Sequence, residues 1–228
     1  MFLAMSYWGK LADRYGNYWH MGTITISQKH IFERRLGLFP AFLDEDGTFY
    51  CYTGYGDYPF IIPEKKIQSP ADIFPGWMLL SYDKKTFVSS SVDTLPAAHI
   101  TDEDIRTYWA AASGKSGEYA VVDLEDTCDV YAVQVNFAEH NTGLFDRKHS
   151  TRHRYTLAYS NDKIDWHRWI DRSKNGPDIS HDYIQLARMV RCRYIKITNI
   201  EVPGGNFAIN GFRVFGKGRG AEPETPVG

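Results

Sequence analysis

The chain has 228 residues, enough for one large or two modest domains, and its 43% hydrophobic content is that of a globular protein. Its formal net charge is −2 and no basic block is present, which argues against a nucleic-acid partner. No apolar run of about 18 or more residues occurs, so the sequence predicts no membrane span. Aromatic residues make up 15% of the chain, which favours β structure because rings pack well on pleated surfaces.

The first residues, MFLAMSYWGKLADRYGNYW, lack a basic start and a small-residue cleavage site, so no signal peptide is expected in this chain. Their pattern indicates a chain that begins within a domain.

Cys51, Cys128 and Cys192 have no metal-like spacing, and an odd count leaves at least one thiol free. We interpret the cysteines as small buried hydrophobic residues.

Residues 1–80 alternate short strand patterns with Gly and Pro. Strands are expected at Tyr18–Ser27, Arg35–Phe39 and Thr48–Thr53, the last after the turn Asp44–Gly47, whose Asp-Gly step is a strong turn signal. No helix pattern of useful length appears. Such a segment forms one propeller blade or part of a sandwich, and it buries too little surface to be stable alone.

The segment HIFERRLGLFPAFLDEDGTFYCYTGYGDYP (His30–Pro59), followed by GWMLLSY (Gly76–Tyr82), resembles the last blade and exit segment of bacterial glycoside hydrolases similar to family 43. Those five-bladed β-propellers act on β-xylosides or α-L-arabinosides. The resemblance implies that the three catalytic carboxylates come from earlier blades, which this chain lacks. We therefore assign no catalytic residue and expect the chain to be a hydrolase fragment that is inactive alone.

Two residues of this blade segment are candidates for the propeller axis. The resemblance implies that His20 approaches a central ion and that Arg34 reaches a substrate hydroxyl. For both, a structural role within the blade is the preferred interpretation.

The second part of the chain begins near Asp83 with a polar connector, DKKTFVSSSV. An alternating run, a Ser-Asn-Asp turn and an aromatic return strand in Arg154–Trp169 predict a half-buried hairpin. Further strand patterns follow at fairly regular spacing with no helix between them, which favours an antiparallel sandwich. These patterns are Glu118–Leu124, Val130–Ala138, Arg193–Ile200 and Phe207–Gly216.

Five short sequence motifs occur in this order along the second part of the chain: ITDEDIRTYWAA, YAVVDL, YTLAYSNDKIDW, RYIKITN and GFRVFG. Together they resemble the discoidin, or coagulation factor V/VIII C-type, fold, whose bacterial sugar-binding members form carbohydrate-binding module family 32. The expected fold class is therefore all-β: a partial β-propeller blade segment in residues 1–82, then a discoidin-like (galactose-binding-like) antiparallel β-sandwich jelly roll in 83–217. Residues 218–228 are expected to be a Gly/Pro-rich linker or tail.

The resemblance implies a structural Ca²⁺ held by Asp102, Asp104 and Thr107 with backbone carbonyls, because hard cations need several oxygen ligands. The chain departs from the family at Gly211, where the modules often carry a glutamate ligand. An acidic turn closed by its own hydrogen bonds is the alternative. Both interpretations stay open here.

The long polar loop Glu139–His153 is the candidate sugar-binding site. Phe145 offers an apolar face for a sugar ring, and His140, Asn141 and Arg147 offer hydrogen-bonding groups. A loop that only packs against the blade is the alternative. The histidine spacings fit no metal pattern. Trp109 and Trp166 are expected in the core, and the polar cluster around Asp171–Asp182 is interpreted as Asx turns and an interdomain contact.

These observations predict an accessory, carbohydrate-binding C-terminal portion of a glycoside hydrolase acting on plant-type polysaccharide. Its expected partners are carbohydrate and the upstream propeller blades, and the resemblance implies a secreted, periplasmic or cell-surface location. One alternative is part of an active family 43-like glycosidase in which the sandwich is a buttress. Another is a discoidin-type adhesion domain, which the mostly polar loops disfavour.

Overall fold

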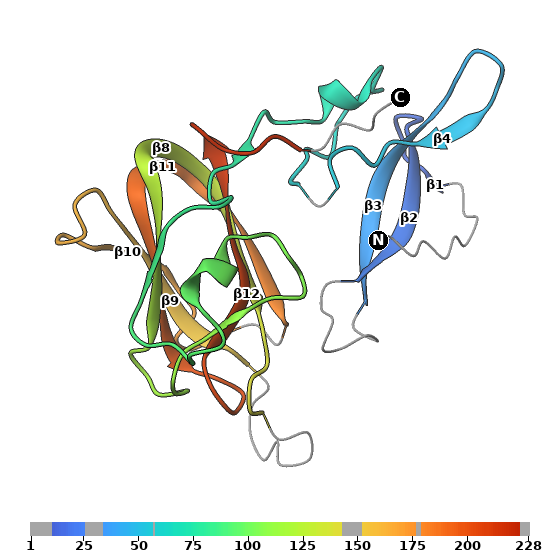
Figure 1. Cartoon of the computed structure of the whole chain (residues 1–228). Helices are drawn as coiled ribbons and strands as arrows, with labels where there is room; N and C mark the ends of the chain where they lie inside the picture. Colours follow the sequence, from blue (N-terminus) through green and yellow to red (C-terminus); the bar gives the residue numbers. More distant parts are fainter. Residues whose placement is uncertain (1–10, 26–33, 57, 143–151, 177–178, 224–228) are drawn as a thin grey trace. The chain divides into compact units, whose positions relative to one another are not determined.

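The computed structural model describes residues 11–25, 34–56, 58–142, 152–176 and 179–223 (Figure 1). It divides into two compact units, Met1–Trp77 with Glu222–Gly228 and Met78–Ala221. Among the described residues the regular structure consists of antiparallel strands and two short 3₁₀ helices, which confirms the all-β prediction. No described helix is long and apolar enough to cross a membrane.

The first unit contains a four-stranded antiparallel sheet in the order β1-β2-β3-β4. The strands are β1 (Leu11–Ala12), β2 (Tyr18–Thr25), β3 (Arg34–Leu43) and β4 (Phe49–Cys51), followed by the 3₁₀ helix η1 (Pro70–Asp72). The predicted turn before β4 is present: Gly47 has a φ of +82°, and its N–H donates to the Asp44 carbonyl at 3.0 Å. A four-stranded meander is what one propeller blade requires, but the propeller itself stays a prediction.

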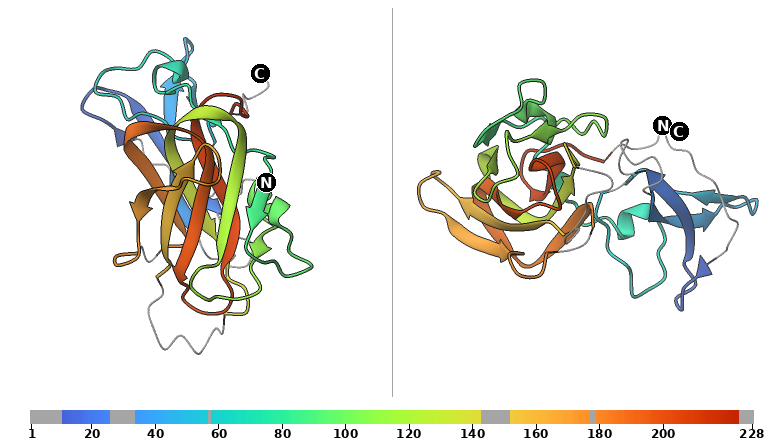
Figure 2. Two further views of the ribbon diagram at one scale, coloured as in Figure 1. Left: turned by 90° about the vertical axis from the view of Figure 1, so that its left-hand side faces the viewer. Right: turned by 90° about the horizontal axis from the view of Figure 1, so that it is seen from below.

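The second unit is a sandwich whose sheet runs β10-β9-β11-β8-β12-β5, with β6 added on β8 and β7 on β12. Figure 2 shows the layered strands from two further directions. The 3₁₀ helix η2 (Ala97–Ile100) precedes β7. The strand bounds are β5 (Met78–Leu79), β6 (Thr86–Val88), β7 (Trp109–Ala110), β8 (Tyr119–Phe137), β9 (Arg154–Ser160), β10 (His167–Asp171), β11 (His181–Glu201) and β12 (Ala208–Lys217).

Two long strands, β8 with 19 residues and β11 with 21, connect the two layers. The first part of β8 pairs with β6 and the last part of β11, and β9 continues that layer. The last part of β8 pairs with β12 and the first part of β11 in the other layer. Both strands bend where they pass between the layers, as Figure 1 shows at the top of the sandwich. The sequence patterns Glu118–Leu124 and Val130–Ala138 are therefore the two halves of one strand.

An ion pair between Arg193 of β11 and Asp123 of β8 connects the two strands at the bend. Arg193 Nε and Nη2 donate to the two carboxylate oxygens of Asp123 at 2.8 and 3.1 Å, and the Glu125 N–H donates to the same carboxylate at 2.8 Å. Glu125 itself takes a positive φ of 69°. Burial opposes the charge of Asp123, but these hydrogen bonds outweigh it and lower the pKa of its carboxyl.

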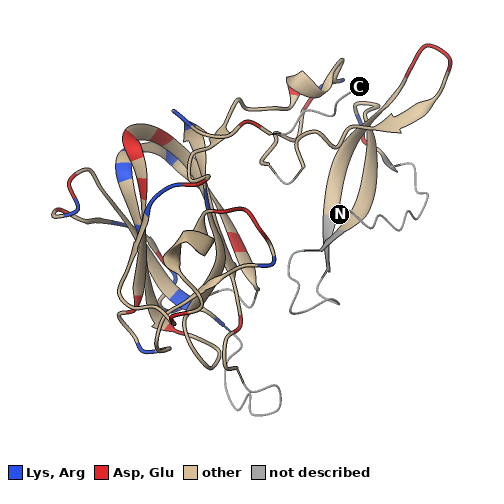
Figure 3. Ribbon diagram, viewed as in Figure 1, with Lys and Arg blue, Asp and Glu red and all other residues tan. Residues whose placement is uncertain are grey.

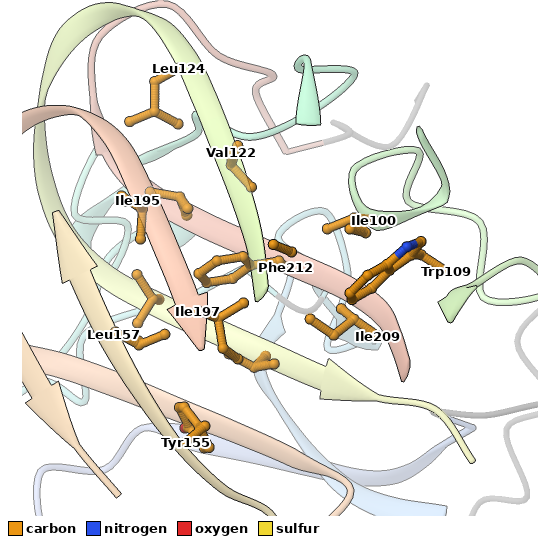
Figure 4. Close-up of a cluster of buried hydrophobic side chains, with 14 of the residues drawn as sticks. Ile100, Trp109, Val122, Leu124, Tyr155, Leu157, Ile195, Ile197, Ile209 and Phe212 are labelled. Carbon is orange, nitrogen blue, oxygen red and sulfur yellow. The ribbon is translucent and has the colours of Figure 1, made fainter. Parts of the chain in front are cut away.

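The core lies between the layers and is built from aromatic and branched side chains (Figure 4). Trp109 is fully buried, as expected, and meets Phe207 edge to face with ring centroids 5.6 Å apart. The expectation for Trp166 is wrong: its side chain is half-buried beside the turn, with Lys196 Nζ 4.1 Å from its ring centroid. The turn extends through Asp165, so β10 begins only at His167.

The chain stays hydrogen-bonded to the sandwich beyond the end of β12. Leu79 and Ala221 form an antiparallel bridge with two backbone hydrogen bonds of 2.9 and 3.0 Å. A Cβ on Gly220 would lie 2.6 Å from the Leu79 carbonyl oxygen, so glycine permits this approach. Ala221 is thus held against β5. The strand β5, which lies in the motif GWMLLSY, belongs to the second unit and pairs with β12.

Candidate functional site

Three loops meet at one end of the sandwich, around His140. The Asn206 N–H donates to the His140 carbonyl at 2.9 Å, and Asn141 Nδ2 donates to Asn206 Oδ1 at 3.1 Å. Asn206 Nδ2 in turn donates to the Ala111 carbonyl at 2.8 Å. The hydroxyl of Tyr108 lies 3.1 Å from His140 Nδ1, and the two rings are 5.9 Å apart. The loop after β8 is therefore held against segments far away in the sequence.

Glycine makes this junction possible. Gly205 has a φ of +66°, and a Cβ there would overlap the His140 carbonyl oxygen and lie 2.7 Å from the Asn141 carbonyl carbon. The neighbouring Gly204 accepts a hydrogen bond at its carbonyl from Thr142 Oγ1 at 3.1 Å. The close backbone approach fixes where the His140 and Asn141 side chains emerge.

The cluster gathers polar side chains and an aromatic ring in one place. An imidazole, amides and a tyrosine ring lie together, and Asn141 is exposed while Tyr108, His140 and Asn206 are half-buried. Such groups supply hydrogen bonds to hydroxyls and a planar face for sugar C–H groups. The predicted His140 and Asn141 both belong to this cluster, and their role in sugar binding stays a prediction. The other predicted residues of this loop, Phe145 and Arg147, lie outside the described residues and stay predictions.

Tyr108 and Asn206, which complete this cluster, are not among the residues predicted from the sequence. Tyr108 precedes β7, whose two residues are both fully buried, so strand alternation gives no local signal for it. Asn206 carries no local signal either, because its role depends on the return of a loop distant in sequence. His153 has another role, since its ring stacks on Phe137 at 3.9 Å and is only 7% exposed.

The predicted calcium loop is closed by its own hydrogen bonds. Asp102 Oδ1 accepts from the Asp104 N–H at 3.0 Å, and Asp102 Oδ2 accepts from Thr107 Oγ1 at 2.7 Å. Asp104 Oδ1 accepts from the Arg106 N–H at 2.8 Å. The carbonyls of Ile105 and Thr107 both accept from Asn210 Nδ2, the former at 3.2 Å.

The contacts of this loop are those of an acidic turn, and the calcium ion stays a prediction. An amide N–H₂ group faces the two loop carbonyls, where a cation would need oxygen ligands only. Arg213, 2% exposed, lies beside the loop with Nε 2.9 Å from Glu103 Oε2. Among the residues that the structure describes, no group of three His, Cys, Asp or Glu side chains is arranged to hold a metal ion. The acidic-turn interpretation accounts for the observed contacts.

The propeller-axis candidates lie in neighbouring strands of the first unit. His20 lies on β2 opposite Phe39, and its side chain is half-buried. Arg34 begins β3 opposite Thr25, but its side chain lies outside what the structure describes. Their proximity to a propeller axis stays a prediction.

A second polar group in the sandwich is structural. Asp182, only 5% exposed, accepts from the Tyr155 hydroxyl at 2.7 Å and from Arg172 Nε at 3.1 Å. Asp171 accepts from the Ser173 N–H at 2.9 Å, which is the expected Asx turn.

Figure 3 shows acidic and basic residues interspersed over the described strands and loops of the second unit.

Comparisons with known proteins point to one family. Residues 84–210 match the F5/8 type C domain. Chitosan-binding module 1 of a chitosanase/glucanase from Paenibacillus sp. IK-5 has a TM-score of 0.50 at 20% identity, covering 60% of this chain and 98% of that one. Module 2 of the same enzyme, in complex with chitotriose, has a TM-score of 0.50 at 20% identity, covering 60% and 99%.

A third solved structure, CpGH89CBM32-4 produced by Clostridium perfringens, is in complex with GlcNAc-α-1,4-galactose. It has a TM-score of 0.50 at 18% identity and covers 62% of this chain and 95% of that one. At these identities the likeness concerns the fold, and it confirms the predicted discoidin-like sandwich. No curated protein matches the chain.

Proposed function

The chain belongs to the F5/8 type C domain family through residues 84–210, and we propose that its second unit is a carbohydrate-binding module that serves a glycoside hydrolase. The observation that carries the proposal is the cluster at the end of the sandwich. There the side chains of Tyr108, His140, Asn141 and Asn206 gather hydrogen-bonding groups beside an aromatic ring.

The proposed ligand is a plant-type polysaccharide of xyloside or arabinoside units. This part rests on the resemblance of residues 30–59 and 76–82 to a family 43-like propeller, and the sandwich would position that enzyme on its substrate. The proposed partners are therefore the polysaccharide and the upstream blades, in a secreted, periplasmic or cell-surface protein. The chain alone is proposed to be inactive.

The test is calorimetric titration of the full chain with xylo-, arabino-, galacto- and chito-oligosaccharides. A shallow site of this size predicts a binding free energy of about −4 to −5 kcal/mol, which corresponds to a Kd of about 0.2–1 mM. His140→Ala should weaken binding about tenfold. The matched control is His167→Ala, which removes an exposed histidine from β10. Binding that survives His140→Ala unchanged would place the site elsewhere.

The alternative is that the sandwich only supports the propeller. A folded chain that binds none of the oligosaccharides would favour this alternative. Binding to a particular sugar series would favour the module and would also identify the ligand.

A further inference from the structure

We propose that Cys128 and Cys192 form a disulfide when the chain folds in an oxidising environment. The two residues are direct partners in the register of β8 and β11, at the bend that joins the layers of the sandwich. Both thiols are free in the structure. The inference is independent of the proposed sugar site.

The register places the two thiols at cross-linking distance. Residues directly opposite in an antiparallel pair have Cα atoms about 4.5–5.5 Å apart, within the range of about 4.4–6.8 Å found for disulfides. Their side chains also project from the same face of the sheet. Cys128 is 2% exposed, Cys192 is 0% exposed, and both belong to the core cluster. A cross-link here requires no large backbone movement.

The surroundings of the two thiols favour a disulfide between Cys128 and Cys192 over a stable mixed disulfide with a small thiol. A Cβ on Gly218 would lie 2.6 Å from Cys128 Sγ, so the backbone directly after β12 closes the space over this thiol. A bulky mixed disulfide on Cys128 has no room in the folded sandwich. Burial, with the neighbouring Cys128, raises the pKa of Cys192 to about 12, so little thiolate is present once folding is complete. The bond should therefore form during folding, before the core closes.

The reaction needs a disulfide oxidant, for which oxidised glutathione serves. A thiolate of one cysteine attacks the glutathione disulfide, forms a mixed disulfide and releases one glutathione thiolate. The thiolate of the second cysteine then attacks the protein sulfur of the mixed disulfide and releases the second glutathione. Two protein thiols are oxidised to one disulfide, and one glutathione disulfide is reduced to two thiols.

The experiment is refolding of the full chain from urea in a glutathione redox buffer, beside refolding in a phosphine reductant. Free thiols are then alkylated in denaturant, and the masses of the chain and its peptides are measured. Cys51→Ser is included because Cys51, half-buried in β4, is the competing thiol. We expect the Cys51→Ser chain to lose two thiols, to yield a peptide linking Cys128 with Cys192, and to melt about 10 °C higher than its reduced form.

Cys192→Ala in the Cys51→Ser background should show no redox-dependent shift in melting temperature. The proposal fails if both thiols of the refolded Cys51→Ser chain remain alkylatable, or if they carry separate glutathione adducts. It fails equally if the linked form melts no higher than the reduced form. Because the mass measurement uses chains that retain both cysteines, it holds even if Cys192→Ala does not fold.

Discussion

The junction at Gly205 allows a sharp test of how the loops at the end of the sandwich are held. Gly205→Ala places a Cβ on a residue whose φ is +66°, a conformation that costs an L-residue about 1–2 kcal/mol. The added atom also overlaps the His140 carbonyl oxygen, so the loops must separate. That movement weakens two hydrogen bonds, from the Asn206 N–H at 2.9 Å and from Asn141 Nδ2 at 3.1 Å, each contributing about 1 kcal/mol.

The expected loss in the free energy of unfolding is therefore about 3 kcal/mol, or about 6–12 °C in melting temperature for a chain of this size. Scanning calorimetry and urea unfolding of the full chain measure both quantities. Gly204→Ala is the matched control, since its Cβ meets only the Thr142 methyl group at 3.3 Å and its φ is not positive. Equal losses in the two variants, or a loss at Gly205 below about 1 kcal/mol, would refute the reasoning.

Three further predictions concern the ion pair at the bend, a buried hydroxyl and the acidic loop. Asp123→Asn should reduce the free energy of unfolding at pH 7. Folding lowers the pKa of this carboxyl, so its contribution is complete above the unfolded pKa of about 4 and is lost as the pH falls through the lower folded pKa. Tyr155→Phe should cost about 1–2 kcal/mol in urea unfolding, because Asp182 loses a buried donor. Asn210→Asp should create a calcium-dependent rise in melting temperature, whereas calcium or a chelator should leave the wild-type value unchanged.

Two control variants and one contrary result check these predictions. Asp93→Asn, at an exposed position, should leave the free energy of unfolding at pH 7 as in the wild type. Tyr159→Phe, on the same strand as Tyr155, should cost less than about 0.5 kcal/mol. A wild-type chain that melts higher with calcium would contradict the acidic-turn interpretation of the Asp102–Thr107 loop.

Local pattern was enough to predict the hairpin of β9 and β10. Alternation in Tyr155–Tyr159 gave the first strand, and the turn residues act as expected: Ser160 Oγ accepts from the Lys163 N–H at 3.0 Å, and Asp162 Oδ1 accepts from the Ile164 N–H at 2.8 Å. Lys163, at a φ of +67°, lengthens the turn. The turn therefore takes in more residues than the Ser-Asn-Asp pattern indicates, and Trp166 lies before β10 instead of within it. Composition alone does not reveal the left-handed conformation of Lys163.

The first half of β11 was not predicted, although its pattern has the right period. Ile184, Leu186 and Val190 are half-buried at alternate positions, but Arg188 is exposed where the alternation would place another apolar residue. A strand that is partly exposed to solvent can be recognised only when its pairing partner is known, because its own sequence pattern is weak. The partner of this part of β11 is β8. The same limit applies to the site, where Tyr108 and Asn206 meet His140 only through tertiary contacts.

The bridge between Leu79 and Ala221 also bears on how this architecture is assembled. The sandwich begins at Met78 and ends at Ala221, so its entry and exit strands are hydrogen-bonded neighbours. A domain with adjacent ends can be inserted into a host chain, or removed from it, with little change in the path of the host backbone. The sandwich therefore has the geometry of a cassette: a short linker from Trp77 to Glu222 should span the gap that its excision leaves, and the same cassette should be transferable into an exposed loop of another protein.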